Sequence, residues 1–143
     1  MKILLLLFFI LPPVTWLTDF NKAKIIAKEE NKLILLNFSG SDWCGPCIKL
    51  KRDYFGSQAF MDMANEKLVL VNADFPRKKK NMADPAQIKT NEALAEIYNK
   101  EGGFPMTLLL DADGKVLKKW DGLPSVTIDE WTKEVSGYCK HGK

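Results

Sequence analysis

The sequence predicts an α/β fold: a three-layer sandwich in which helices cover both faces of a mixed central sheet. Two continuous apolar runs, residues 33–38 and 68–73, are typical of strands covered on both faces. Segments with helical spacing of apolar residues separate these runs from each other and from a third, residues 106–110. A turn sequence then leads into a fourth strand, so an antiparallel hairpin extends the parallel part of the sheet.

The first half of the chain supplies two strands and three helices. Thr18 and Asp19 can cap a helix that ends near Asn31, and the strand over 33–38 follows it. A second helix is predicted to begin around Cys44, because its apolar residues fall among charged ones, at Ile48, Leu50 and Tyr54. Ser57 then caps a short helix before the second strand.

The second half begins with a loop over residues 74–85 and a helix over 87–100. After the third strand, residues 111–114 read Asp-Ala-Asp-Gly, which favours a hairpin turn into a strand over 116–120. The last helix is predicted over 127–138.

We interpret residues 1–16 as an N-terminal signal sequence or anchor, followed by a single domain over 17–143. Lys2 precedes an unbroken apolar run over residues 3–11, which is too short for the roughly 20 residues that a bilayer core requires. A secretory signal fits this pattern. No Ala-x-Ala cleavage site follows, so an uncleaved membrane anchor remains an alternative. Export by a bacterial-type signal would place the domain in a periplasm-like space, where disulfides form.

The composition fits one compact domain. The chain has 143 residues, 46% hydrophobic and 27% charged, and can bury a core without a disulfide framework. The net charge is +3, and the single basic run is Arg77-Lys78-Lys79-Lys80. We predict that this run lies in a solvated loop. No aromatic platform or basic helix accompanies it, so we expect no nucleic-acid binding.

The most informative residues follow the first predicted strand: Trp43, Cys44, Gly45, Pro46 and Cys47. Two thiols three positions apart at a helix start can close a small disulfide ring without a large backbone movement. The first thiol lies where the unpaired N–H groups and the dipole of the helix favour a thiolate. This arrangement predicts redox chemistry.

Strand, five-residue motif and helix in this order resemble thioredoxin, and the five residues match its active site at every position. The resemblance covers roughly residues 17–138. It implies that Phe104 and Pro105, directly before the third strand, form a cis peptide bond facing the active-site disulfide. It further implies that the backbone of Phe104 holds an extended substrate segment, and that Gly122 flanks the substrate groove.

The resemblance implies a thiol-disulfide oxidoreductase. Cys44, expected to be partly exposed, is the nucleophile, and the more buried Cys47 resolves the mixed disulfide. Trp43 shields the site, and Gly45 and Pro46 set the geometry between the cysteines. The Gly-Pro pair matches strongly reducing members, so we expect a reductase. Its partners are disulfide-containing proteins and an upstream thiol protein that donates electrons. We expect a monomer with no cofactor and no metal.

The chain departs from thioredoxin in the strand before the cysteines. Asn37 stands where thioredoxin has a buried aspartate, and Leu70 stands where it has the neighbouring lysine. Losing both charges together is physically coherent, because one buried charge without its partner is costly. The acid that serves the second cysteine is therefore missing, and we place Asp42 in an exposed loop rather than in that role. The segment over 76–100 is longer than in thioredoxin and resembles exported bacterial relatives.

Two other functions stay open. Cys44, Cys47, Cys139 and His141 could form a four-ligand zinc site. Alternatively, the chain could be a redox-inactive binding or chaperone-like module that keeps the fold. Cys139 itself is expected to be a free thiol near the end of the last helix.

Overall fold

A computed structural model describes residues 13–141 of the chain. Its regular elements, in chain order, are β1 (Trp16–Leu17), α1 (Phe20–Glu30), β2 (Leu33–Ser39), α2 (Gly45–Lys49), η1 (Leu50–Phe55), α3 (Gln58–Lys67), β3 (Leu68–Asp74), η2 (Lys79–Asn81), α4 (Pro85–Tyr98), β4 (Met106–Leu110), β5 (Val116–Asp121) and α5 (Ile128–His141). The element η1 is a π-helical continuation of α2, and η2 is a short 3-10 turn.

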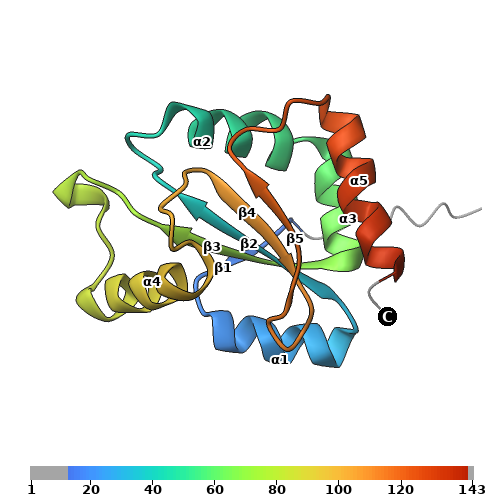
Figure 1. The fold of residues 1–143 in the computed structure, drawn as a ribbon, viewed down its shortest axis with the longest axis horizontal. Helices are drawn as coiled ribbons and strands as arrows, with labels where there is room; N and C mark the ends of the chain where they lie inside the picture. Colours follow the sequence, from blue (N-terminus) through green and yellow to red (C-terminus); the bar gives the residue numbers. More distant parts are fainter. Residues whose placement is uncertain (1–12, 142–143) are drawn as a thin grey trace, which may run out of the picture.

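The five strands form one mixed sheet in the order β1-β3-β2-β4-β5 (Figure 1). β1 and β2 both run parallel to β3, while β4 is antiparallel to β2 and to β5. The predicted mixed sheet is therefore confirmed. β2 lies in the middle, and all seven of its residues are buried, which explains why its sequence is apolar almost throughout.

Helices cover both faces of the sheet, so the predicted three-layer sandwich is also confirmed. Figure 1 shows α1 and α4 on one side and α2, α3 and α5 on the other. Residues of β2 alternate between the two cores: Ile34, Leu36 and Phe38 pack with α1 and α4. Leu33 and Leu35 pack with η1, α3 and α5. The helix that follows the cysteines is thus fixed to the sheet by its own apolar face.

The chain differs from the sequence prediction at its first strand. Trp16 pairs with Leu70 and Leu17 with Val71, so Trp16 belongs to the sheet although we assigned it to the N-terminal segment. A strand of two residues shows no periodicity, and it begins only five residues after the end of the apolar N-terminal run. The other strands and the α-helices lie where predicted, although α4 begins at Pro85 and α5 continues to His141. The short turn η2 lies within the segment predicted as a loop.

The predicted signal sequence or anchor lies for the most part outside the described residues, which begin at Pro13. Between residues 13 and 141, no helix combines the length and the apolar character needed to cross a bilayer.

Trp131 is the centre of the core on the active-site side of the sheet. Its ring is 1% exposed and lies 5.8 Å from each of Phe55 and Phe60, and 5.6 Å from Trp120. Among the described residues its indole N–H has no hydrogen-bond partner. An unpaired buried donor of this kind costs about 1–3 kcal/mol.

We therefore predict that Trp131→Ala lowers the free energy of unfolding by about 3–5 kcal/mol. Trp131→Phe keeps most of the ring contacts and removes the unpaired donor, so its stability should stay within about 1 kcal/mol of wild type. Urea unfolding followed by circular dichroism measures both changes. Equal losses in the two variants would contradict this account of the core.

Candidate active site

Cys44 and Cys47 form a disulfide at the start of α2, directly beyond the end of β2. Their Cα atoms are 5.2 Å apart. Cys44 is the N-cap residue with an extended backbone, and its Sγ accepts the Cys47 N–H at 3.3 Å. Pro46 lies in the first turn of the helix, where its missing N–H breaks no helical hydrogen bond. The N-terminal end of α2 therefore faces the Cys44 sulfur.

Both cysteines are buried in this disulfide form. Cys44 is 5% exposed and Cys47 is 3% exposed. The prediction that Cys44 is partly exposed is therefore wrong for the oxidised protein. The reason is that the bond to Cys47 turns the Cys44 sulfur toward the first turn of the helix, where it accepts the Cys47 N–H.

Trp43 is held beside the disulfide by contacts on several sides. Its indole N–H donates to the Phe75 carbonyl at 2.7 Å, and its ring lies edge-on to Phe104 at 5.4 Å. The Arg77 guanidinium lies 3.9 Å from the centre of the same ring. A Cβ atom at Gly40 would approach the indole to 2.3 Å, so only glycine lets the ring pack at this point.

The peptide bond between Phe104 and Pro105 is cis, as the resemblance to thioredoxin implied. The Pro105 carbonyl accepts the N–H of Gly122 at 2.8 Å. Gly122 has a φ of 78°, a backbone conformation that favours glycine. The predicted residues Phe104, Pro105 and Gly122 therefore meet in one place, and within the described chain neither the N–H nor the C=O of Phe104 forms a hydrogen bond.

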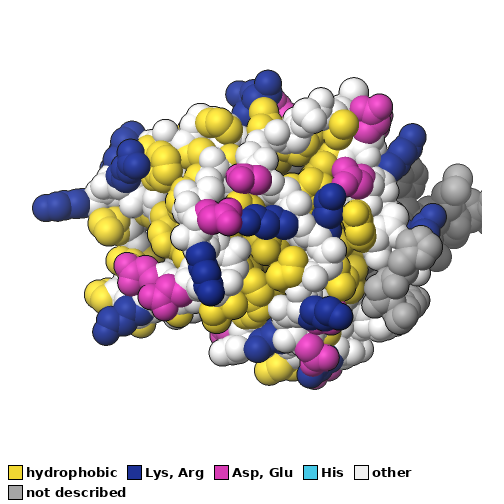
Figure 2. Space-filling model, viewed as in Figure 1, with side chains coloured by type: hydrophobic (Ala, Val, Ile, Leu, Met, Phe, Trp, Pro, Cys, Tyr) yellow, Lys and Arg dark blue, Asp and Glu magenta, His cyan; other side chains and the backbone are white. Residues whose placement is uncertain are grey.

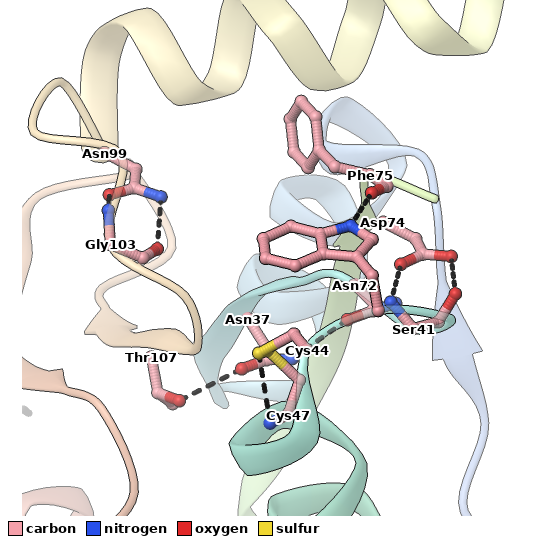
Figure 3. Close-up of a disulfide and its surroundings, with 11 residues drawn as sticks. Asn37, Ser41, Cys44, Cys47, Asn72, Asp74, Phe75, Asn99, Gly103 and Thr107 are labelled. Carbon is pink, nitrogen blue, oxygen red and sulfur yellow. Dashed lines mark hydrogen bonds between the residues drawn. A yellow bond between two sulfur atoms is a disulfide. The ribbon is translucent and has the colours of Figure 1, made fainter. Parts of the chain in front are cut away.

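Asn99 fixes the segment that leads into this bond, and sequence reasoning missed it. Its side-chain N–H donates to the Gly103 carbonyl at 2.9 Å, and its side-chain oxygen accepts the Gly103 N–H at 3.0 Å (Figure 3). Asn99 is only 3% exposed. A single asparagine after a helix belongs to no recognisable sequence motif. The clamp, by which we mean the two hydrogen bonds between Asn99 and Gly103, is therefore visible only in the structure.

A neutral polar network lies on the face of the sheet that α2 covers. The Asn37 amide donates to Asn72 Oδ1 at 3.0 Å, and the Thr107 hydroxyl donates to Asn37 Oδ1 at 3.1 Å. Figure 3 draws this network beside the disulfide. Leu70, the counterpart of the thioredoxin lysine, is buried in the apolar core. The predicted loss of both charges therefore holds, and Asn72 and Thr107 supply neutral hydrogen bonds that the sequence comparison did not anticipate.

Asp42 ties a neighbouring loop to the active-site motif. Its carboxylate accepts the N–H groups of Arg77 at 2.9 Å and Lys78 at 3.0 Å, and the Asn81 amide at 2.9 Å. These hydrogen bonds, the one from Arg77 above all, lower the pKa of Asp42. Asp42 thus acts as an anchor for the loop, in agreement with the prediction that it does not replace the buried acid.

The zinc site that the sequence left open does not form. Cys139 lies on α5 beside Leu33 and Lys67, where β2 begins and α3 ends, whereas Cys44 follows the last residue of β2. Seven residues of strand separate these ends, which is roughly 23 Å. In residues 13–141, no three histidine, cysteine or acidic side chains are grouped as metal ligands. Cys139 is a free thiol whose pKa is raised by burial.

Comparison with known proteins agrees with this geometry. The family model for the thioredoxin-like domain matches residues 20–136. The chain belongs to this thioredoxin-like family. The match covers every residue from α1 to the middle of α5, and therefore the whole site described above.

Two proteins of Chlamydia pneumoniae are similar in sequence to this chain. It is 39% identical over 93 residues to the disulfide bond reductase DsbH of Chlamydia pneumoniae, and the match covers 65% of this chain and 54% of that protein. It is 30% identical over 87 residues to the thioredoxin-related protein DsbJ of the same organism, covering 55% of this chain and 25% of DsbJ. The chain thus spans about half of the first relative and a quarter of the second.

A solved structure described as DsbH oxidoreductase superimposes with a TM-score of 0.79 at 32% identity. The superposition covers 90% of this chain and 86% of that chain. The fold of this chain is therefore the fold of that solved structure.

We predict that Asn37→Asp makes stability depend on pH. Position 37 is 5% exposed, and burial favours the neutral form of a carboxyl group, so the folded state would hold its proton to higher pH than the unfolded state. Because the folded state then binds more protons, the free energy of unfolding falls as pH rises above the unfolded pKa. We expect about 2–3 kcal/mol less stability at pH 8 than at pH 4, relative to wild type.

The matched control is Asn21→Asp, which places the same group on the exposed surface of α1. Urea unfolding of the oxidised proteins across this pH range measures both. A pH dependence at position 37 no larger than at position 21 would show that the network around Asn37 is open to solvent.

Proposed function

We propose that this protein is a thiol-disulfide oxidoreductase that reduces disulfides in exported proteins. The observation that carries the proposal is the Cys44–Cys47 disulfide at the start of α2, within a family-typical arrangement that includes the cis bond at Pro105. Such a site exchanges two electrons between a dithiol and a disulfide without any cofactor.

In the first step, the Cys44 thiolate attacks one sulfur of the substrate disulfide. A mixed disulfide forms between Cys44 and the substrate, the substrate S–S bond breaks, and the departing substrate sulfur takes up a proton. Cys44 is the better nucleophile because it caps the start of α2, where the Cys47 N–H donates to its sulfur at 3.3 Å and the helix dipole favours a thiolate.

In the second step, Cys47 loses its proton and attacks the Cys44 sulfur. The Cys44–Cys47 bond re-forms, and the substrate leaves as a dithiol that carries the two electrons. Asn37, Asn72 and Thr107 hold no group that titrates near neutral pH, so they supply no base for this step. The proton of Cys47 then passes to water or to the departing substrate thiolate.

The segment around Phe104 is well placed to hold the substrate during both steps. Its backbone N–H and C=O form no hydrogen bond among the described residues, and an extended peptide can pair with such groups. Gly122 borders the same segment through its bond to Pro105, and the ring of Trp43 contacts Phe104 from the other side.

Three features support the direction and the place of the reaction. Gly45 and Pro46 match strongly reducing thioredoxins, and a relative at 39% identity is named a disulfide bond reductase. The apolar run before Pro12 favours export, with an uncleaved anchor as the alternative.

A reductase in an exported space needs a thiol protein that returns Cys44 and Cys47 to the dithiol form. We propose that the protein acts as a monomer.

Reduction of insulin by dithiothreitol tests this function directly. The wild-type protein should accelerate it, and Cys44→Ser should return the rate to that of dithiothreitol alone, because no nucleophile remains at the helix start. Cys139→Ser is the matched control and should stay within about twofold of wild type, since Cys139 lies at the far end of β2.

A redox-inactive binding module makes the opposite prediction. In that case the wild-type protein would not accelerate insulin reduction, while wild type and Cys44→Ser would bind an unfolded polypeptide equally well. That result would overturn the proposed function.

A further inference from the structure

The basic segment, defined here as Arg77, Lys78, Lys79 and Lys80, is fastened to the active-site motif. It follows β3, which lies next to β2 in the sheet, so the loops after these two parallel strands meet at one edge. Asp42 accepts two backbone N–H groups of the segment. The sequence prediction of a solvated loop holds, but the loop lies beside the disulfide.

Arg77 brings the segment into contact with the motif itself. Its guanidinium lies 3.9 Å from the centre of the Trp43 ring, and Trp43 directly precedes Cys44. The fold thus places the Arg77 guanidinium against the side chain that precedes Cys44, whose sulfur we propose as the nucleophile.

The side chains of the basic segment are exposed and form no ion pair within residues 13–141. The nearby carboxylates are engaged locally: Asp42 holds the backbone of the segment, Asp74 accepts from Ser41, and Asp84 caps α4. Figure 2 shows Lys and Arg side chains standing clear of the surface at the end of the molecule where Figure 1 places the loop between β3 and α4. Lys78 also helps to lower the pKa of Asp42 by its charge, while the exposed side chains of Lys79 and Lys80 present their charges to solvent, where a partner can meet them.

The surface next to the basic segment is aromatic. The Phe104 ring contacts both other rings, with centroid distances of 5.4 Å to Trp43 and 5.5 Å to Phe75. All three side chains are half-buried, so each keeps part of its surface exposed. An apolar contact with a charged border on one side suits a polypeptide whose own charge is opposite.

We propose that the basic segment selects substrate polypeptides that carry acidic residues beside the reacting disulfide. This inference rests on the proposed function, because it names the class of partner for the same site. The positive charges of the basic segment attract an acidic segment of the substrate and orient its disulfide toward Cys44. Such complementarity acts mainly on the rate of productive encounter, and it weakens as salt screens the charges.

The test uses two synthetic peptides that each contain one intramolecular disulfide. They differ only in a run of three residues beside it, glutamate in one and glutamine in the other. The pre-reduced protein is mixed with each peptide, the reaction is quenched with acid, and the thiols are separated and quantified. Each rate is divided by the rate with dithiothreitol, a neutral thiol that corrects for the intrinsic reactivity of the peptide.

We expect wild type to reduce the glutamate peptide about tenfold faster than the glutamine peptide at low salt. In the variant with Lys78→Gln, Lys79→Gln and Lys80→Gln, this ratio should fall toward one, and about 0.5 M salt should lower the wild-type ratio in the same way. The matched control carries Lys115→Gln, Lys133→Gln and Lys140→Gln, three exposed lysines elsewhere on the surface. It has the same net charge and should keep the wild-type ratio.

A wild-type ratio near one, or an equal loss of selectivity in both triple variants, would overturn the inference while leaving the reductase function intact. Failure of wild type to reduce either peptide faster than the buffer alone would instead overturn the proposed function, and the inference with it.

Discussion

Cys44 is the residue before the first turn of α2, and the Cys47 N–H of that turn donates to its sulfur. The other features of the site depend on this position. Helix α2 can begin there because β2 ends five residues earlier at Ser39 and Gly40 leaves room for Trp43 to fold back against the sheet. The apolar face of the helix then packs through Leu50 into the core beneath. A shift of this start by one residue would turn the sulfur away from the helix dipole.

The remaining parts of the site come from distant segments that the sheet brings to the same edge. β4 runs antiparallel to β2, so the start of β4 lies beside the end of β2, and this places Pro105 near the cysteines. Asn99 clamps Gly103, and Gly122 donates to the Pro105 carbonyl. These bonds order the chain on both sides of Phe104, while its own backbone groups have no partner in the described part of the chain. The fold thus holds a strand-like segment ready for pairing.

The network below the disulfide distinguishes this chain from thioredoxin. A buried carboxylate can move a proton, whereas the amides of Asn37 and Asn72 can only donate and accept hydrogen bonds. The neutral network therefore avoids the free-energy cost of burying a charge. It also lacks the base that a buried carboxylate would provide. In the proposed mechanism, resolution by Cys47 then relies on solvent or on the substrate for proton transfer.

Much of the fold and the central motif can be predicted from the sequence. β2 and β3 are long, continuous apolar runs, and the Cys-Gly-Pro-Cys motif directly follows one of them. The resemblance to thioredoxin adds Pro105 and Gly122, which are distinctive residue types at fixed places. What could not be predicted are features without local signal: the two-residue strand at Trp16, the clamp by Asn99 and the hydrogen bonds of Asn72 and Thr107. The position of the basic segment also required the fold, because its contact with Trp43 joins residues 34 positions apart.

The most direct measurement of the central claim is the alkylation rate of each cysteine in the reduced protein. Iodoacetamide is added at pH 7, and the modified cysteines are mapped by mass spectrometry at successive times. Because only the thiolate reacts, Cys44 at the helix start should be modified at least about tenfold faster than the half-buried Cys139. Unfolding in urea should bring the rates together. Equal rates in the folded protein would contradict the claim that the start of α2 activates Cys44.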